Sequence, residues 1–122
     1  MNTSRAVLVV DDSVAIRSVM AGILRQNAYV VYEAESGMAA LTEWQRHKDE
    51  IGLVLADVVM PEMDGLTLAQ QLRKQASHLA IVLLSGHINE DTQWVADEAN
   101  FSFLPKPFES TQLLETVRSM LG

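Results

Sequence analysis

Five residues with acidic, hydroxyl or amino side chains follow short apolar runs of the sequence. Asp11 and Asp12 come after V-L-V-V, Asp57 after L-V-L-A, Ser85 after I-V-L-L, and Lys106 after F-L-P. If these runs are parallel strands, their carboxyl ends share one edge of a sheet, which is where α/β proteins bind ligands. The sequence therefore predicts that three carboxylates, a hydroxyl and an ammonium converge there.

Such a group of carboxylates needs a cation. At about 4 Å and an effective dielectric near 20, each pair of like charges costs on the order of 4 kcal/mol. The ligands are hard oxygens with no histidine or cysteine among them, which favours Mg²⁺ or Mn²⁺ over zinc. Mg²⁺ also binds phosphate oxygens, while a lysine neutralises phosphoryl charge and a serine hydroxyl donates to it. These residues indicate a site that handles a phosphoryl group beside Mg²⁺.

The elements that must position this site are short strands alternating with helices. Apolar runs begin near Ala6, Tyr29, Leu53, Ala80 and Ser102, and each interval has room for a strand, a loop, a helix and a second loop. Runs such as I-V-L-L are apolar on both sides, as in strands that are buried on both faces. This alternation predicts an α/β fold in which helices cover both faces of a parallel sheet.

Apolar residues at helical spacing fill the intervals between the runs. Ile16, Val19, Met20, Ile23 and Leu24 form one face of a first helix. Ser36 and Asp64 are suited to cap the second and third helices. The other helices are marked by Met38, Leu41 and Trp44, by Leu66, Ala69 and Leu72, by residues 89–100, and by Leu113, Val117, Met120 and Leu121.

Length and composition exclude several classes of function. The chain has 122 residues, enough for one domain, and no cysteine, which excludes a disulfide scaffold, a thiolate zinc site and a cysteine nucleophile. Its net charge of −7 repels phosphate backbones, so we expect no nucleic-acid binding by this domain alone. Its apolar runs are too short to cross a bilayer and M-N-T-S-R does not resemble a signal peptide, so we expect a cytoplasmic protein without a membrane partner.

Four segments carry a resemblance to a known family. V-L-V-V-D-D-S at 7–13, D-V-V-M-P-E-M-D-G at 57–65, L-L-S-G at 83–86 and F-L-P-K-P-F at 103–108 resemble the receiver domain of two-component response regulators. The resemblance runs from about Ala6 to Leu121, which implies a single receiver domain over residues 1–122. It also implies a flavodoxin-like, doubly wound sheet of five parallel strands in the order 2-1-3-4-5, with five helices.

The resemblance implies a role for each residue that matches the family's pattern. Asp57 corresponds to the aspartate that accepts the phosphoryl group. Asp12 and Asp57 correspond to carboxylate ligands of Mg²⁺, Val59 would supply its backbone carbonyl, and Asp11 would act mainly through a metal-bound water. Lys106 corresponds to the lysine that pairs with the phosphate.

The resemblance also implies a conformational switch. Ser85 corresponds to the switch hydroxyl and Phe103 to the switch aromatic residue, and the Lys106–Pro107 bond is usually cis in the family. Phosphorylation would repack the face formed by the fourth helix, the fifth strand and the fifth helix. Phe103 lacks the hydroxyl that tyrosine often brings to this position, so we do not expect a partner that reads that hydroxyl.

The implied partners are a sensor histidine kinase or a histidine phosphotransfer protein upstream, and an output domain or protein downstream. The domain would catalyse only its own phosphorylation and dephosphorylation and would not otherwise be an enzyme. A phosphorylation-dependent dimer stays open, although residues 88–100 contain no Lys or Arg for the dimer salt bridge usual in winged-helix regulators. L-S-G-H and F-L-P-K-P-F also resemble receivers of hybrid histidine kinases, so a stand-alone phosphorelay intermediate and a part of a larger protein both stay open.

Three other functions fit the residues less well. A Mg²⁺-dependent phosphohydrolase of the haloacid-dehalogenase type needs an acid two residues after its nucleophilic aspartate, and Val59 cannot transfer a proton. A flavodoxin-like cofactor binder needs a Gly/Thr-rich phosphate loop, where this chain has D-D-S. A degenerate receiver would lack some of the matching residues, and all of them are present.

Overall fold

The computed structural model describes residues 5–86 and 101–121. Its strands form one five-stranded parallel sheet in the order β2-β1-β3-β4-β5, which confirms the predicted topology. The strands are β1 (Ala6–Val10), β2 (Val31–Ala34), β3 (Ile51–Asp57), β4 (Ala80–Ser85) and β5 (Ser102–Pro105). Because all five strands run the same way, their carboxyl ends meet at one edge, as the site requires.

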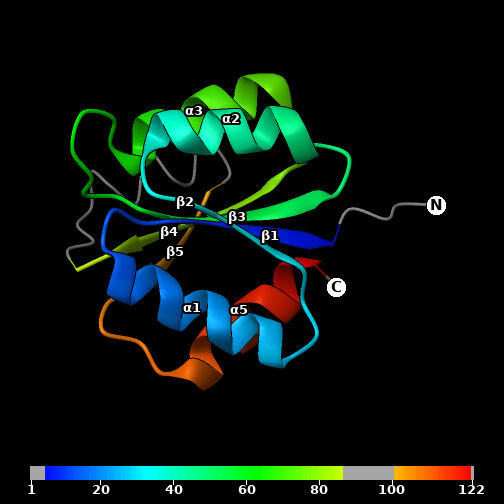
Figure 1. Cartoon of the computed structure of the whole chain (residues 1–122), viewed down its shortest axis with the longest axis vertical. Coiled ribbons are helices and arrows are strands. Elements are labelled where there is room, and N and C mark those ends of the chain that lie inside the picture. The colour runs from blue at the N-terminus through cyan, green and yellow to red at the C-terminus, as the bar shows by residue number, and fades with distance from the viewer. Residues whose placement is uncertain (1–4, 87–100, 122) are drawn as a thin grey trace.

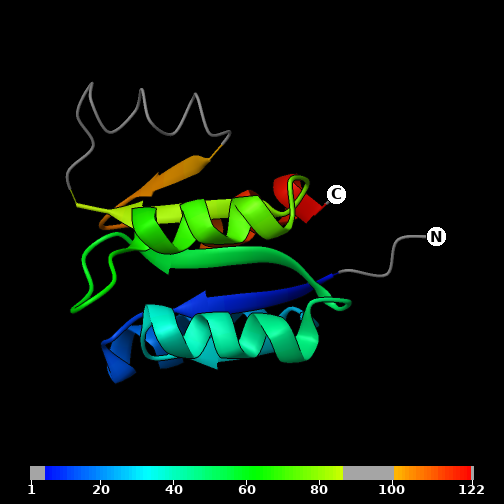
Figure 2. The ribbon, with the colours of Figure 1, turned by 90° about the horizontal axis from the view of Figure 1, so that it is seen from above.

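Helices cover both faces of the sheet (Figures 1 and 2). The helices are α1 (Val14–Gln26), α2 (Gly37–His47), α3 (Gly65–Gln75) and α5 (Ser110–Leu121). Figure 1 shows α2 and α3 side by side on one face and α1 with α5 on the other. The helix expected over residues 89–100 lies outside the described residues.

The strands bury side chains on both faces because each face has its own core. Along β1, Val7 and Val9 belong to the core that includes residues of α1 and α5, whereas Leu8 and Val10 belong to the core that includes residues of α2 and α3. From the helices, Met20, Leu24, Leu113 and Val117 fill the first core, and Trp44, Leu68 and Leu72 fill the second. The continuous apolar runs of the sequence are thus explained by burial from both sides.

Polar residues cap three of the described helices, which begin beside the carboxyl ends of the strands. The side chains of Ser13, Ser36 and Asp64 accept hydrogen bonds from the backbone N–H three residues further on, at the starts of α1, α2 and α3. Each such cap stabilises a helix by about 1 kcal/mol. The predicted caps Ser36 and Asp64 are confirmed.

Two sequence-based expectations differ from the structure. The apolar runs located two strand starts only to within two residues, since the second strand begins at Val31 where Tyr29 was expected, and the third at Ile51 where Leu53 was expected. On α1, Ile16 is 42% exposed and Val19 is 61% exposed, although both belong to the predicted apolar face. The buried side of α1 is centred on Met20, Ala21 and Leu24, so the apolar stripe is wider than the side that meets the sheet. In the described part of the chain, no helix is long and apolar enough to span a membrane.

Candidate functional site

Asp57 is the last residue of β3, and hydrogen bonds hold the loop that follows it. Its carboxylate is mostly buried, and Oδ1 accepts a hydrogen bond of 3.2 Å from the backbone N–H of Val59. The N–H of Gly65 donates to the carbonyl of Val58 at 2.9 Å, which closes the loop that follows the strand. A side chain at Gly65 would collide with the backbone carbonyl of Asp57, so this close approach requires glycine.

Two further carboxylates come from the loop between β1 and α1. Asp11 is buried, and its Oδ1 accepts a hydrogen bond of 2.9 Å from the backbone N–H of Ser13. Its Oδ2 is also buried and has no hydrogen-bond partner. Asp12 is exposed at the same edge, and one carboxylate oxygen from each of Asp11, Asp12 and Asp57 lies within 4.8 Å of the others.

The pKa of Asp11 is raised above its usual value. Burial is the main cause, and the neighbouring charges of Asp57 and Asp12 act in the same direction. The N–H of Ser13 and the ammonium of Lys106 oppose this effect only in part. The buried Oδ2 of Asp11 and the group of three acids are compatible with metal binding. A cation would give the buried oxygen a partner and would neutralise the repulsion among the carboxylates.

Lys106 supplies the positive charge of the site. Its Nζ lies 3.0 Å from Oδ2 of Asp57, and its side chain is 26% exposed. Its backbone N–H donates to the carbonyl of Ser85 at 2.8 Å, which fixes the start of the loop after β5. The Lys106–Pro107 peptide bond is cis, as the family resemblance implies.

The two expected switch residues lie on the neighbouring strands β4 and β5. Ser85 ends β4 and is 5% exposed. Phe103 is partly buried, and it is paired with Leu83 in the register of β4 and β5. The sheet thus brings Ser85 to the edge that carries the acids, with Phe103 two residues before the end of the adjoining strand.

One residue that contacts this site, Arg17, was not predicted from the sequence. Arg17 on α1 donates from Nη1 to the backbone carbonyl of Asp11 at 2.8 Å. Its position four residues after the capping Ser13 gives a weak signal, since it places the side chain on the first turns of the helix beside the acidic loop. Its partner Glu33 comes from β2 and could not be paired with it from spacing alone.

An apolar groove of about 570 Å³ adjoins the site. It lies between α1 and the segment that joins β5 to α5, and Ile16, Val19, Met20, Phe108 and Lys106 contribute to its walls. The exposed apolar residues of α1 therefore border the lysine that pairs with Asp57.

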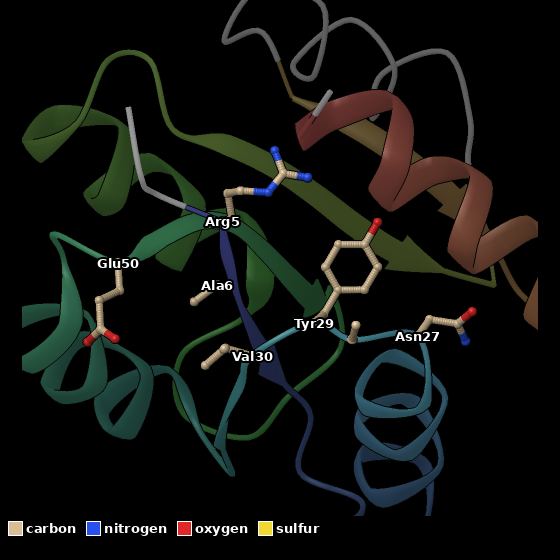
Figure 3. A pocket seen from close by; sticks show the side chains of 7 residues that line it. Arg5, Ala6, Asn27, Tyr29, Val30 and Glu50 are labelled. Atoms are coloured by element: carbon tan, nitrogen blue, oxygen red, sulfur yellow. The ribbon is translucent and has the colours of Figure 1, made fainter. Parts of the chain in front are cut away.

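A second hollow, of about 430 Å³, lies at the opposite edge of the sheet (Figure 3). It surrounds the start of β1, where Arg5 and Glu50 contribute the charged groups and Tyr29 an aromatic ring. Arg5 and Glu50 are exposed, and none of the acids of the carboxylate cluster lines the hollow. This second hollow therefore has no part in the site.

Comparison with known proteins agrees with this geometry. The family model of the response regulator receiver domain matches residues 7–118. The chain is 39% identical over 122 residues to the sensor kinase CckA of Brucella abortus, covering 99% of this chain but 13% of the kinase. It is 32% identical to the chemotaxis protein CheY of Bacillus subtilis, covering 95% of this chain and 97% of that protein.

Solved structures of receiver domains share the fold. Chemotaxis protein CheY4 of Vibrio cholerae superposes with a TM-score of 0.87 at 28% identity, covering 94% of this chain and 97% of that one. The receiver domain of NtrX from Brucella abortus gives a TM-score of 0.85 at 32% identity, with the same coverage of 94% and 97%. Together with the family model and the acidic edge of the sheet, these matches show that the chain belongs to the response regulator receiver domain family of two-component signalling.

Proposed function

We propose that Asp57 accepts a phosphoryl group in a reaction that depends on a divalent cation, and that the phosphorylated domain switches an output. The observation that carries this proposal is the 3.0 Å contact between Lys106 Nζ and Asp57 Oδ2 at the rim of the three-carboxylate cluster. In the proposed step a carboxylate oxygen of Asp57 bonds to phosphorus while the bond from phosphorus to the donor breaks. The donor's leaving group, an imidazole or a carboxylate, takes the electron pair of that bond.

The residues present fit Mg²⁺, with Mn²⁺ as the alternative. The site offers hard oxygen donors and the unpartnered, buried Oδ2 of Asp11, which suits an oxygen-binding cation or a water bound to it. Asp12, Asp57 and the backbone carbonyl of Val59 would hold the ion, with Asp11 acting through a water. When bound, Mg²⁺ supplies positive charge that offsets the negative charge of the phosphoryl oxygens.

Lys106 and Ser85 then act on the phosphoryl oxygens directly. Lys106 already lies beside the Asp57 carboxylate, so its ammonium is placed to neutralise charge as the new bond forms. Phosphorylation brings a charge of about −2 at neutral pH and three acceptor oxygens. Ser85, at the end of the adjacent strand, would donate to one of them, and Phe103 would follow by repacking.

This repacking would reach the face made by β5, α5 and the predicted fourth helix. To shift the ratio of the active to the inactive conformation from 1:99 to 99:1, the phosphoryl group must interact with the active conformation more favourably by about 5.5 kcal/mol. One charge-assisted hydrogen bond from Ser85 supplies about 1.5 to 3 kcal/mol of it. Lys106 and backbone N–H groups near the phosphate would supply the rest.

The phosphoryl donor that fits best is a protein that presents a phosphohistidine, either a sensor histidine kinase or a histidine phosphotransfer protein. Such a donor must place its phosphorus within bonding distance of Asp57, so it must cover the surface around Lys106. The apolar groove beside α1 begins there, and Ile16 and Val19 offer it an exposed apolar surface. The proposal places this exchange in the cytoplasm, with an output domain or protein downstream.

A role as an intermediate in a phosphorelay is the second candidate. One observation favours it: the relative CckA is named a sensor kinase, and this chain corresponds to 13% of its length. In such a relay the phosphoryl group would leave Asp57 for a histidine of a phosphotransfer protein. The same site chemistry serves both candidates.

Beryllofluoride, which mimics a phosphoryl group, tests the proposal. We expect beryllofluoride with Mg²⁺ to shift the backbone amide signals of residues 101–108 in NMR spectra as well as those around Asp57. Asp57→Asn should abolish all of these shifts, whereas Ser85→Ala should keep those at the site and lose those along β5. Shifts confined to the site in the wild-type protein would contradict the switch.

A further inference from the structure

Arg17, on the first turns of α1, contacts the loop between β1 and α1 that carries Asp11 and Asp12. Its side chain is 14% exposed, and Nη1 donates to the backbone carbonyl of Asp11 at 2.8 Å. On the other side of the same residue, the N–H of Asp11 donates to the carbonyl of Ala34 at 3.1 Å. Asp11 is therefore held by hydrogen bonds at both its backbone N–H and its carbonyl.

The Asp11 carbonyl belongs to the peptide unit that joins Asp11 to Asp12. This unit is planar, so a hydrogen bond that fixes its oxygen also fixes the direction in which the chain enters Asp12. The exposed carboxylate of Asp12 has no regular strand or helix of its own to hold it in place. The contact with Arg17 is therefore a constraint on the loop that must present both carboxylates.

Glu33 on β2 holds Arg17 in this place. Its Oε1 lies 3.3 Å from Nε of Arg17, and its Oε2 lies 2.9 Å from Nη1 of Arg25. Arg25 also donates from Nη2 to the carbonyl of Val31 at 2.9 Å, which ties it to the strand that carries Glu33. The planar guanidinium of Arg17 serves the carboxylate through Nε and the carbonyl through Nη1, an arrangement that a lysine cannot reproduce.

We propose that Arg17 is a positioning residue for the cation site, and that Glu33 keeps its guanidinium on the Asp11 carbonyl and away from the carboxylate cluster. This inference rests on the proposed cation-dependent function. Without the Glu33 carboxylate, the guanidinium of Arg17 is drawn to the carboxylate cluster of Asp11, Asp12 and Asp57 and competes with the cation. Without the guanidinium fork, the Asp11–Asp12 peptide loses its fixed orientation.

Calorimetric titration of the metal-free protein with MgCl₂ tests this inference, and it does not depend on phosphorylation. We expect Arg17→Lys, which keeps the charge and loses the fork, to weaken Mg²⁺ binding about fivefold, the weight of one hydrogen bond. Glu33→Gln should weaken binding by a similar factor. Arg46→Gln is the matched control, because Arg46 also pairs with an acid, Glu43 at 3.4 Å, but on α2; it should leave the affinity unchanged.

The outcomes separate the inference from the function on which it rests. If the wild-type protein binds no Mg²⁺ at millimolar concentrations, the proposed function fails. If the wild-type protein binds Mg²⁺ and Arg17→Lys binds it equally well while its melting temperature falls, Arg17 is merely structural and the inference is overturned. Should Arg17→Lys not fold, Glu33→Gln decides, and an unchanged affinity in that variant overturns the inference as well.

Discussion

The ammonium of Lys106 lies 3.0 Å from Oδ2 of Asp57, and the same lysine lines the apolar groove along α1. Lys106 thus connects the residue that we propose to be phosphorylated with the surface that we propose for the donor. Its backbone N–H donates to the backbone carbonyl of Ser85, so Lys106 contacts both the proposed acceptor and the end of the strand that carries the proposed switch serine. These contacts join the carboxyl ends of three neighbouring strands, β3, β4 and β5, and by this route we expect phosphorylation of Asp57 to affect β4 and β5.

Replacing Lys106 should impair switching more than folding. The lysine of the pair with Asp57 is 26% exposed, and ion pairs that solvent reaches contribute at most about 1 kcal/mol to stability. We therefore expect Lys106→Ala to unfold in urea within about 1 kcal/mol of the wild-type protein. Its amide shifts along β5 on addition of beryllofluoride should be largely lost. Lys74→Ala, which changes an exposed lysine of α3, should alter neither property. A collapsed fold in Lys106→Ala would mean that the lysine is structural.

Removing the buried charge of Asp11 should stabilise the metal-free protein. Asp11→Asn keeps the oxygen that accepts from Ser13 and removes a charge that is buried next to Asp57 and Asp12. We expect the free energy of unfolding without Mg²⁺ to rise by about 1 to 3 kcal/mol at pH 7, because a buried charge without a partner costs more than a buried neutral amide. Urea denaturation measures this change. A lower free energy of unfolding in Asp11→Asn would contradict this prediction, because it would show that the folded protein stabilises the negative charge of Asp11.

The same group predicts a pH dependence. Folding raises the pKa of Asp11, so the folded chain binds this proton more tightly than the unfolded chain. The contribution of Asp11 to stability is therefore fully present below the unfolded pKa of about 3.9 and is lost as the pH rises through the higher folded value. Urea denaturation in a pH series without Mg²⁺ should show this loss in the wild-type protein but not in Asp11→Asn. Parallel pH profiles for the two proteins would contradict it.

Two glycine substitutions should have opposite effects. Gly65→Ala places a methyl group against the backbone carbonyl of Asp57, so we expect it to lower stability by about 1 to 3 kcal/mol and to slow phosphorylation. Gly22→Ala puts the same methyl group in open space on α1 and should raise stability by up to about 1 kcal/mol. Thermal denaturation compares the pair. Equal changes of melting temperature in the two variants would show that Gly65 does not pack tightly against the Asp57 carbonyl.

The lifetime of the phosphorylated state should depend on Val59. This side chain is 77% exposed two residues after Asp57 and offers no hydrogen bond to orient an attacking water. If water positioning limits hydrolysis, Val59→Asn should speed loss of phosphate several-fold. Val30→Asn, which changes another exposed valine at the opposite edge of the sheet, is the control and should have no effect. The other residue expected to flank the water, His87, lies outside the described residues. An unchanged rate of phosphate loss in Val59→Asn would show that Val59 does not limit hydrolysis.

The acidic site could be predicted from the sequence because its residues stand at strand ends. Asp11, Asp57 and Ser85 each follow a run that is apolar on both sides, and parallel strands bring those ends to one edge. Whereas the strand order was implied by the family resemblance, the caps Ser36 and Asp64 followed from patterns of the same local kind. Such features depend on neighbours in the sequence, which is why they were predictable.

Contacts between distant segments were not predictable in the same way. Nothing in the spacing joins Glu33 to Arg17, because their contact depends on how β2 lies beside the first turns of α1. The exposure of Ile16 and Val19 was also missed. Helical periodicity shows that a stripe is apolar, but it does not show how much of the stripe meets the sheet.

The most direct test of the central claim is the intact mass of the protein after incubation with acetyl phosphate. We expect the wild-type protein to gain the mass of one phosphoryl group with Mg²⁺ present and none when the metal is chelated. Asp57→Asn should gain nothing in either condition, while Asp64→Asn, an acid that caps α3, should behave like the wild-type protein. A gain in Asp57→Asn, or an equal gain without Mg²⁺, would contradict the account.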